Sequence, residues 1–196
     1  MSRLTGIVML ALGAAPSHAE RFVITPGAGN RVQFESKAAV ETFTGKTSKV
    51  DGSVVLDPAQ LGDSIAVEVV VDMASLDTGI GLRNKHMCDN HLDCAKFPRA
   101  RFVAGKLGKP TAPALAPGSK VSFELSGTLD LHGVARPLTA PVEMTLVEAS
   151  GARHLEISTH FPVKLADFQI ARPTMLVLKL NDVQQVTVKL IARAPK

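Results

Sequence analysis

The chain has 196 residues, of which 45% are hydrophobic and 20% are charged, and this composition excludes a disordered or collagen-like protein. Its formal net charge of +4 is the difference between 22 basic and 18 acidic residues, which are scattered without a basic run. Eight Phe are present, but there is no Trp and no Tyr. A surface that binds nucleic acid through phosphates or stacked bases is therefore not expected.

The first 19 residues have the pattern of a secretory signal peptide. A basic start is followed by an apolar run over residues 4–15 and by small residues at Ser17 and Ala19. This pattern predicts cleavage after Ala19 and a mature domain at residues 20–196. The alternative is a buried N-terminal helix, since the run is too short to span a bilayer.

The predicted leader implies a bacterial periplasmic or secreted protein, in a compartment that permits disulfides. No later run reaches about 18 apolar residues, so the mature domain is not expected to be embedded in a membrane.

After the leader, apolar and polar residues alternate with a period of two. Val121, Phe123 and Leu125, for example, share one face of a segment whose other face carries Ser122 and Glu124. Such alternation is typical of antiparallel strands with one buried and one solvated face. In chain order it is found at residues 64–72, 120–131, 142–146, 155–165 and 186–190.

Turn signals separate these segments at short intervals. They are Pro26–Gly27, Asp51–Gly52, Asp57–Pro58, His132–Gly133 and Ser150–Gly151. Three prolines in Lys109–Gly118 predict an exposed loop. Two short helical segments are expected, one at Asp57–Leu61, where Asp57 can cap, and one at Thr78–Leu92. No repeat or shift of composition divides the chain, so one domain is predicted.

The many predicted strands favour an all-β barrel. Closure of an antiparallel sheet removes its exposed edges, and about eight tilted strands enclose room for one ligand. A sandwich of two sheets is the competing architecture. Segments of ten or more residues favour the barrel, because long strands suit a tall tube.

Several segments carry a family resemblance through their order and spacing. In the most specific one, Val70–Thr78 is followed by Arg83–Met87 and Ala95–Phe102. The others are Phe22–Thr25, Arg31–Phe34, Thr42–Gly52, Val54–Pro58, Gly127–Leu138, Phe161–Phe168 and Leu180–Val183. Together they resemble the YceI-like family of secreted, polyisoprenoid-binding proteins.

The resemblance implies an extended, lipocalin-like antiparallel barrel whose lumen holds a long isoprenoid or a similar lipid. The inner faces inferred from the alternation supply the candidate lining residues: Val32, Phe34, Val67, Phe102, Phe123, Leu125, Met144, Phe161 and Val188. The alternative is that these residues fill a closed core. The chain departs from the family pattern at Cys88, His91 and Cys94, where apolar or aromatic residues are common.

The segment with His86, Cys88, His91 and Cys94 holds the densest chemistry of the chain. One hypothesis is a disulfide between the two cysteines, which the compartment and the even count allow. Residues six apart in one helix are separated by about 9 Å along its axis, so a bridge requires the helix to end near Asn90. A second hypothesis is a zinc or copper site formed by all four side chains. The third is two free cysteines and two surface histidines.

The sequence thus predicts a carrier that sequesters a polyisoprenoid or an isoprenoid quinone in an apolar lumen, with no cofactor besides the bound lipid. The alternative is a periplasmic redox or metal-handling protein that uses Cys88, His91 and Cys94. A third class is a packed scaffold that binds another protein. No enzyme is predicted, because the common catalytic motifs are missing from the sequence. A homodimer is left open.

Overall fold

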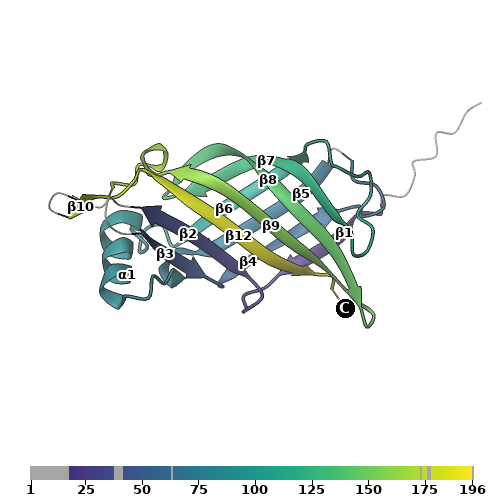
Figure 1. The fold of residues 1–196 in the computed structure, drawn as a ribbon, viewed down its shortest axis with the longest axis horizontal. Helices are drawn as coiled ribbons and strands as arrows, with labels where there is room; N and C mark the ends of the chain where they lie inside the picture. The colour runs from purple at the N-terminus through teal and green to yellow at the C-terminus, as the bar shows by residue number, and fades with distance from the viewer. Residues whose placement is uncertain (1–17, 38–41, 63, 173, 176–177, 196) are drawn as a thin grey trace, which may run out of the picture.

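The computed structural model describes residues 18–37, 42–62, 64–172, 174–175 and 178–195. The predicted signal peptide lies almost entirely outside these residues and stays a prediction. The described strands wind into a barrel that is longer than it is wide, with α1 at one end (Figure 1).

Within these residues the structure has twelve strands, one α-helix and three short turns of other helical types. The strands are β1 Glu20–Ile24, β2 Arg31–Lys37, β3 Thr42–Thr47, β4 Val50–Leu56, β5 Ser64–Asp72, β6 Arg99–Leu107, β7 Lys120–Leu131, β8 Val134–Ala149, β9 Ala152–Lys164, β10 Thr174–Met175, β11 Leu178–Lys179 and β12 Val183–Arg193. The helical elements are η1 Met73–Ser75, α1 Gly81–Met87, η2 Cys88–Leu92 and η3 Leu165–Phe168.

Eight strands close into a ring through antiparallel pairs. The order is β1, β4, β5, β6, β7, β8, β9 and β12, and β12 pairs back with β1. Closure satisfies the backbone groups that an open sheet would leave at its two edges. The predicted antiparallel barrel of about eight strands is therefore confirmed, and the two-sheet sandwich is excluded.

Strands β1 and β2 share one edge of β12. β1 pairs with residues 192–193, and β2 pairs with residues 185–189. In the turn between them the Asn30 side chain donates a hydrogen bond to the Thr25 carbonyl and accepts one from the Ile191 N–H. The hairpin of β2 and β3 thereby extends the wall at the end that carries α1 (Figure 1).

Two predicted turns are tight hairpin turns with positive φ at both residues. The φ angles are 55° and 71° at His132–Gly133 and 51° and 75° at Ser150–Gly151, as in type I′ turns. The turn predicted at Asp51–Gly52 is wrong, because both residues lie inside β4. A Cβ at Gly52 would lie 2.0 Å from the Glu68 carbonyl oxygen, so this glycine permits a close approach of β4 and β5.

The helical predictions are confirmed in part. Thr78–Leu92 contains α1 and the π-helical turn η2. Asp57–Leu61 forms a turn, in which Ala59 donates its N–H to the Asp57 carboxylate, but it does not continue into a helix. The sequence missed η3, because the alternating segment predicted at residues 155–165 runs one residue beyond the end of β9 at Lys164.

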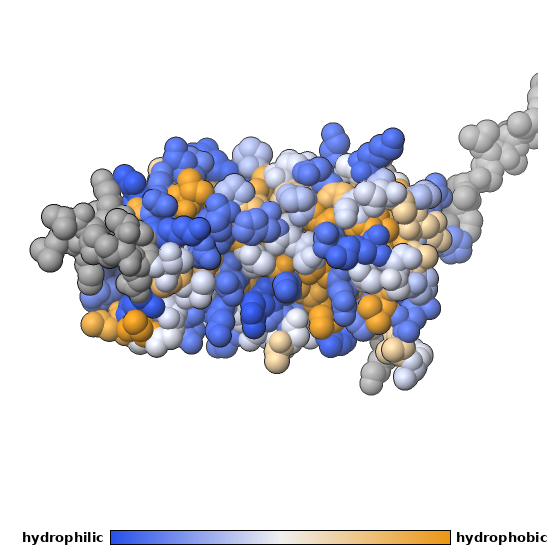
Figure 2. All heavy atoms as spheres, viewed as in Figure 1, coloured by the Kyte–Doolittle hydropathy of each residue, from blue (hydrophilic) through white to orange (hydrophobic). Residues whose placement is uncertain are grey.

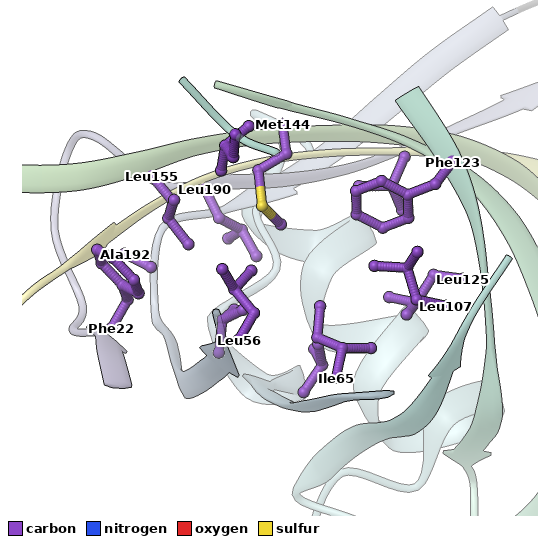
Figure 3. Close-up of a cluster of buried hydrophobic side chains, with 14 of the residues drawn as sticks. Phe22, Leu56, Ile65, Leu107, Phe123, Leu125, Met144, Leu155, Leu190 and Ala192 are labelled. Atoms are coloured by element: carbon purple, nitrogen blue, oxygen red, sulfur yellow. The ribbon is translucent and has the colours of Figure 1, made fainter. Parts of the chain in front are cut away.

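The end of the barrel away from α1, which we call the base, is filled by inward-pointing side chains that meet one another (Figure 3). Their exposed fractions are 0–4% at Phe22, Leu56, Ile65, Leu107, Met144, Leu155, Leu190 and Ala192. The proline-rich connection from β6 to β7 packs across this end. Leu115, which is 2% exposed, donates its N–H to the Pro58 carbonyl at 2.7 Å. The base is therefore closed.

Candidate functional site

The opposite end, which we call the mouth, has an apolar inner wall that is not fully buried. Seven side chains pack against the main core and keep part of their surface accessible: Val32, Val69, Val71, Phe102, Ile157, Phe161 and Val186. An inward-facing side chain stays accessible only where its neighbours leave room for at least a water molecule. The inner wall toward the mouth is therefore less completely covered by its neighbours than the core at the base.

The change from full to partial burial runs along individual strands. On β9, Leu155 is 0% exposed, whereas Ile157 and Phe161 on the same face are half-buried. On β12, Ala192 is 0% exposed and Val186 is half-buried. Residues two apart share a face of a strand, so the inner faces of β9 and β12 are partly exposed between the buried residues near the base and the buried Val163 and Gln184 near the mouth.

All nine predicted lining residues lie in interior clusters. Five are buried in the main core: Val67, Phe123, Leu125, Met144 and Val188. Val32, Phe102 and Phe161 are half-buried against that core, and Phe34 is half-buried in a second cluster at the mouth. Their contact with a lipid stays a prediction.

Four accessible wall residues were absent from the predicted set, namely Val69, Val71, Ile157 and Val186. Val69, Ile157 and Val186 lie on the same face of the same strand as a predicted lining residue. Val71 lies two residues beyond Val69 on that face. The period-two signal that found their neighbours could have found them, but it carries no information on which end of a strand is open.

Residues Gly81–Leu92, which comprise α1 and η2 and which we call the lid, lie over the mouth (Figure 1). The His91 ring nitrogen Nδ1 lies 3.0 Å from the Ala171 carbonyl oxygen. Leu92 packs in two clusters, one built on Met73 and Cys94 and the other on the residues around Phe168.

The start of the lid is fixed by a hydrogen-bonded group. The Asn84 side-chain oxygen accepts bonds from the N–H and the hydroxyl of Thr78, at 2.9 and 2.6 Å. The Asn84 amide donates to the Asp77 carboxylate at 2.8 Å. This bond and one from the Gly79 N–H lower the pKa of Asp77, because both stabilise its charged form.

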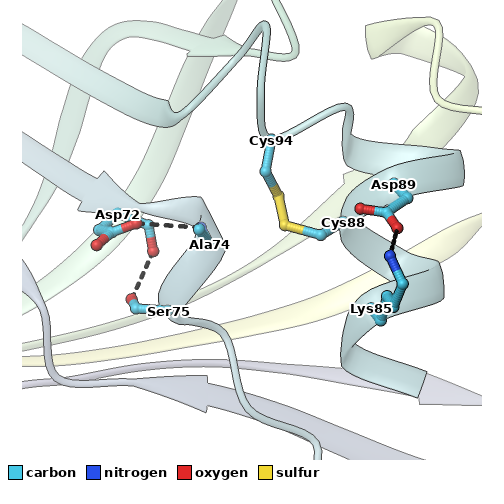
Figure 4. The surroundings of a disulfide bond; sticks show 7 residues. All are labelled: Asp72, Ala74, Ser75, Lys85, Cys88, Asp89 and Cys94. Atoms are coloured by element: carbon cyan, nitrogen blue, oxygen red, sulfur yellow. Dashed lines mark hydrogen bonds and ion pairs between the residues drawn. A yellow bond between two sulfur atoms is a disulfide. The ribbon is translucent and has the colours of Figure 1, made fainter. Parts of the chain in front are cut away.

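Cys88 and Cys94 form a disulfide with a Cα–Cα distance of 5.1 Å (Figure 4). The bridge is confirmed, and the helical segment ends between the two cysteines as the bridge requires, two residues later than the predicted end near Asn90. The helical turn continues to Leu92, and Asp93 then takes a left-handed conformation with φ 44°. The Cys94 N–H donates to the Cys88 carbonyl at 3.0 Å. A left-handed residue after the last turn therefore reverses the chain and brings the two sulfurs together.

The bridge uses both sulfur atoms, so neither serves as a thiolate ligand for a metal. The alternative site of His86, Cys88, His91 and Cys94 thereby loses two of its four ligands. Over the part of the chain that the structure describes, no group of three or more His, Cys, Asp or Glu side chains is arranged to hold a metal ion.

The described interior contains polar residues but no charged one. The buried polar side chains are Asn30, Ser36, Thr47 and Gln184. The hydroxyls of Ser36 and Thr159, on the inner faces of β2 and β9, have no hydrogen-bond partner. The described inner wall therefore consists of apolar side chains and a few neutral polar atoms. It contains no buried acidic or basic side chain.

A groove of about 580 Å³ crosses the outer face of β7, β8, β9 and β12. Most of the surface in this groove is apolar, although most of its lining residues are polar, among them Ser122, Glu124, Glu143, Ser158, His160, Thr187 and Lys189. The surface in Figure 2 likewise shows hydrophilic residues over much of the visible side of the barrel. The groove is open to solvent, whereas the closed ring of strands screens the apolar inner wall from water, so the inner wall is the candidate site for an apolar guest.

Comparison with known proteins agrees with the barrel. A family model described as a YceI-like domain matches residues 22–192. A UPF0312 protein of Shewanella denitrificans is 31% identical over 132 residues, which are 66% of this chain and 64% of that protein. A UPF0312 protein of Vibrio campbellii is 28% identical over 173 residues, covering 85% of this chain and 86% of that protein.

Solved structures share the fold at low sequence identity. A polyisoprenoid binding domain from Saccharophagus degradans has a TM-score of 0.69 at 18% identity and covers 90% of this chain and 99% of its own. BcnA of Burkholderia cenocepacia has a TM-score of 0.66 at 22% identity, with 84% and 97% covered. In the described residues, no helix combines the length and hydropathy needed to cross a bilayer.

Proposed function

Because the chain belongs to the YceI-like domain family, we propose that its barrel is a lipid-binding module whose guest is a long isoprenoid, either a polyisoprenoid or an isoprenoid quinone. The guest lies in the mouth half of the lumen. The protein sequesters or carries this lipid and performs no chemistry on it.

The observation that carries this proposal is the accessible apolar wall inside a closed ring. Residues such as Ile157, Phe161 and Val186 face inward and are half-buried without a guest. Burial of each CH₂ group contributes about 0.8 kcal/mol, so about 20 buried carbons give on the order of 16 kcal/mol before other terms. Association and ordering remove several kcal/mol, and the remainder still permits tight binding.

The fold relative from Saccharophagus degradans is described as a polyisoprenoid binding domain, which supports an isoprenoid as the guest. The neutral interior supports binding without catalysis, because general acid–base chemistry needs a titratable group within reach of the guest. The disulfide counts against the metal-handling alternative, since it occupies both cysteine sulfurs.

The location proposed for this carrier is the periplasm or the exterior of a bacterial cell, with cleavage after Ala19. The bridge between Cys88 and Cys94 supports this, because disulfides persist in oxidising compartments. Cell fractionation and N-terminal sequencing of the purified protein test it. Full-length protein in the cytosolic fraction would overturn the proposed export.

A charge placed on either face of β9 tests the lumen. Ile157→Asp puts a carboxylate on the inner wall, and Ser158→Asp puts one on the outer face of the same strand. After delipidation, each variant is titrated with geranylgeraniol, while circular dichroism and gel filtration verify folding. We expect lost uptake in Ile157→Asp and normal uptake in Ser158→Asp. The proposal would be overturned if the wild-type protein bound neither geranylgeraniol nor ubiquinone.

The Ile157→Asp variant can fail to fold, and a second variant covers that outcome. Val186→Phe keeps the wall apolar but reduces the free space in front of it. We expect this variant to fold and to bind geranylgeraniol more weakly than the wild-type protein. Equal affinity in a folded variant would count against the mouth half of the lumen as the site.

A further inference from the structure

We propose that the lid, Gly81–Leu92, limits the length of the guest that the lumen accepts, and that the Cys88–Cys94 bridge holds the lid closed. This inference rests on the proposed function, because it concerns the specificity of the same lumen.

The lid crosses the mouth from one wall to the opposite wall. It begins after β5, and β9 lies four strands further round the ring of eight. His91 nevertheless reaches the carbonyl of Ala171, in the connection that follows β9 and η3. A chain that only joined β5 to the neighbouring β6 would have no need to approach β9. The connection therefore spans the opening.

Leu92 lies where the two walls meet across this opening. It packs with the cluster of Cys94 on the side of β5 and β6, and with the cluster of Val163 on the side of β9. Phe161 and Val186 contact the second cluster and also belong to the accessible inner wall. Leu92 therefore stands at the outer end of the open lumen, in the path of a guest that extends through the mouth.

The two ends of the lid, near Gly81 and near Leu92, are held by different numbers of contacts, and we call the end near Leu92 the far edge. At its start, Asn84 bonds to Thr78 and Asp77, and the Arg83 guanidinium lies 4.3 Å from the centre of the Phe43 ring. At the far edge the described polar contact is the single bond between His91 and the Ala171 carbonyl, beside the packing of Leu92. The far edge is therefore the one that lifts with least loss of contact.

The disulfide ties this far part of the lid to the fixed rim. Cys88 begins η2, whereas Cys94 is 9% exposed and packs against Met73, Leu76 and Ala100. Without the bridge, η2 would be held by the left-handed turn at Asp93, one backbone hydrogen bond, the bond of His91 to Ala171 and the packing of Leu92. The bridge thus restricts how far Leu92 can move away from the mouth.

The filled base and the closed lid together set the length of the free lumen. Leu155 and Ala192 occupy the base, so a longer guest can extend only toward Leu92. With the lid closed, a short isoprenoid fits and a long one must displace it. Removal of the Leu92 side chain or of the bridge should therefore favour long guests over short ones.

The experiment measures Kd for farnesol, geranylgeraniol and solanesol with delipidated wild-type protein, Leu92→Ala, and the double variant Cys88→Ser/Cys94→Ser. We expect the ratio of the solanesol Kd to the farnesol Kd to fall about tenfold in both variants. Leu82→Ala is the matched control, because Leu82 belongs to the lid and is 67% exposed. Dithiothreitol should reproduce the shift in the wild-type protein and leave the double variant unchanged.

The outcomes separate this inference from the proposed function. If the three alcohols bind to the wild-type protein and their Kd ratios are the same in all variants, the lid does not select guest length and the inference is overturned. If none of them binds to any form, the proposed function fails. A shift in Leu82→Ala equal to that in Leu92→Ala would also overturn the role of Leu92. Circular dichroism excludes variants that do not fold.

Discussion

The contact between Gly45 and Phe34 offers a sharp test of how the mouth is packed. Gly45 is buried and lies opposite Phe34 in the pair of β2 and β3. A Cβ at Gly45 would lie 2.2 Å from Cε1 and 2.5 Å from Cζ of the ring. Carbon atoms in contact prefer separations of about 3.5–4.0 Å, so Gly45→Ala must displace the ring by at least about 1.3 Å.

The ring of Phe34 cannot move freely, because it makes an edge-on contact with Phe43 at a centroid distance of 6.1 Å and packs in the mouth cluster. Overpacking of this kind costs about 1–3 kcal/mol. We therefore expect Gly45→Ala to lower the free energy of unfolding by about 2 kcal/mol. In a Phe34→Leu background the added methyl group meets a smaller side chain, so its cost should fall by at least about 1 kcal/mol.

Urea unfolding followed by far-ultraviolet circular dichroism measures these changes, because the chain has no Trp or Tyr for fluorescence. Gly105→Ala is the control, since its Cβ would have the Ile65 carbonyl as nearest atom, at 3.8 Å. A cost for Gly45→Ala no greater than that for Gly105→Ala would refute the reasoning, as would additive effects of Gly45→Ala and Phe34→Leu.

Three further predictions concern the wall and the lid. Leu155→Ala should destabilise the protein by about 2–5 kcal/mol in urea unfolding, and a smaller loss than that of Ile157→Ala would contradict a filled base. Thr159→Val removes a buried hydroxyl that has no partner, so it should raise the free energy of unfolding by up to about 1 kcal/mol; a clear destabilisation would show that the hydroxyl is bonded. Because hydrogen bonds lower the pKa of Asp77 in the folded protein, its contribution to stability is present above its ordinary value of 3.8 and is lost as the pH falls through the lowered value. The melting temperature of Asp77→Asn should thus depend less on pH below about pH 4, and an unchanged profile would contradict this role.

The inner faces of the strands could be predicted from sequence because burial in a sheet follows a local rule. Val121, Phe123 and Leu125 alternate with polar residues, and the structure buries all three. Irregular pairing breaks the rule: the register between β6 and β7 shifts between Ala104 and Lys106, so both Ala104 and Leu107 are buried although their positions differ in parity. The period of a single segment contains no signal for such a bulge.

The lid could not be predicted in the same way, because its contacts join residues that are far apart in the chain. His91 and Ala171 are 80 residues apart, and Leu92 belongs to two clusters whose other members include Met73 and Phe168. The disulfide was predicted as one of three hypotheses, since residue types and compartment allowed it. The disulfide depends on the chain reversal at Asp93, which takes a left-handed backbone conformation. The presence of an aspartate at that position does not predict this conformation.

The neighbourhood of β1 and β12 has a consequence for the order of assembly. The first and the last strand of the ring meet at only two registered positions, Val23 with Arg193 and Ile24 with Ala192, and Glu20 pairs with Arg153 of β9 at 2.6 Å. The pairing of β1 with β12 cannot form until the C-terminal strand has been synthesised. Until then the apolar inner faces of the earlier strands stay exposed to water. Such distant pairing slows folding and prolongs the exposure of apolar surface that promotes aggregation.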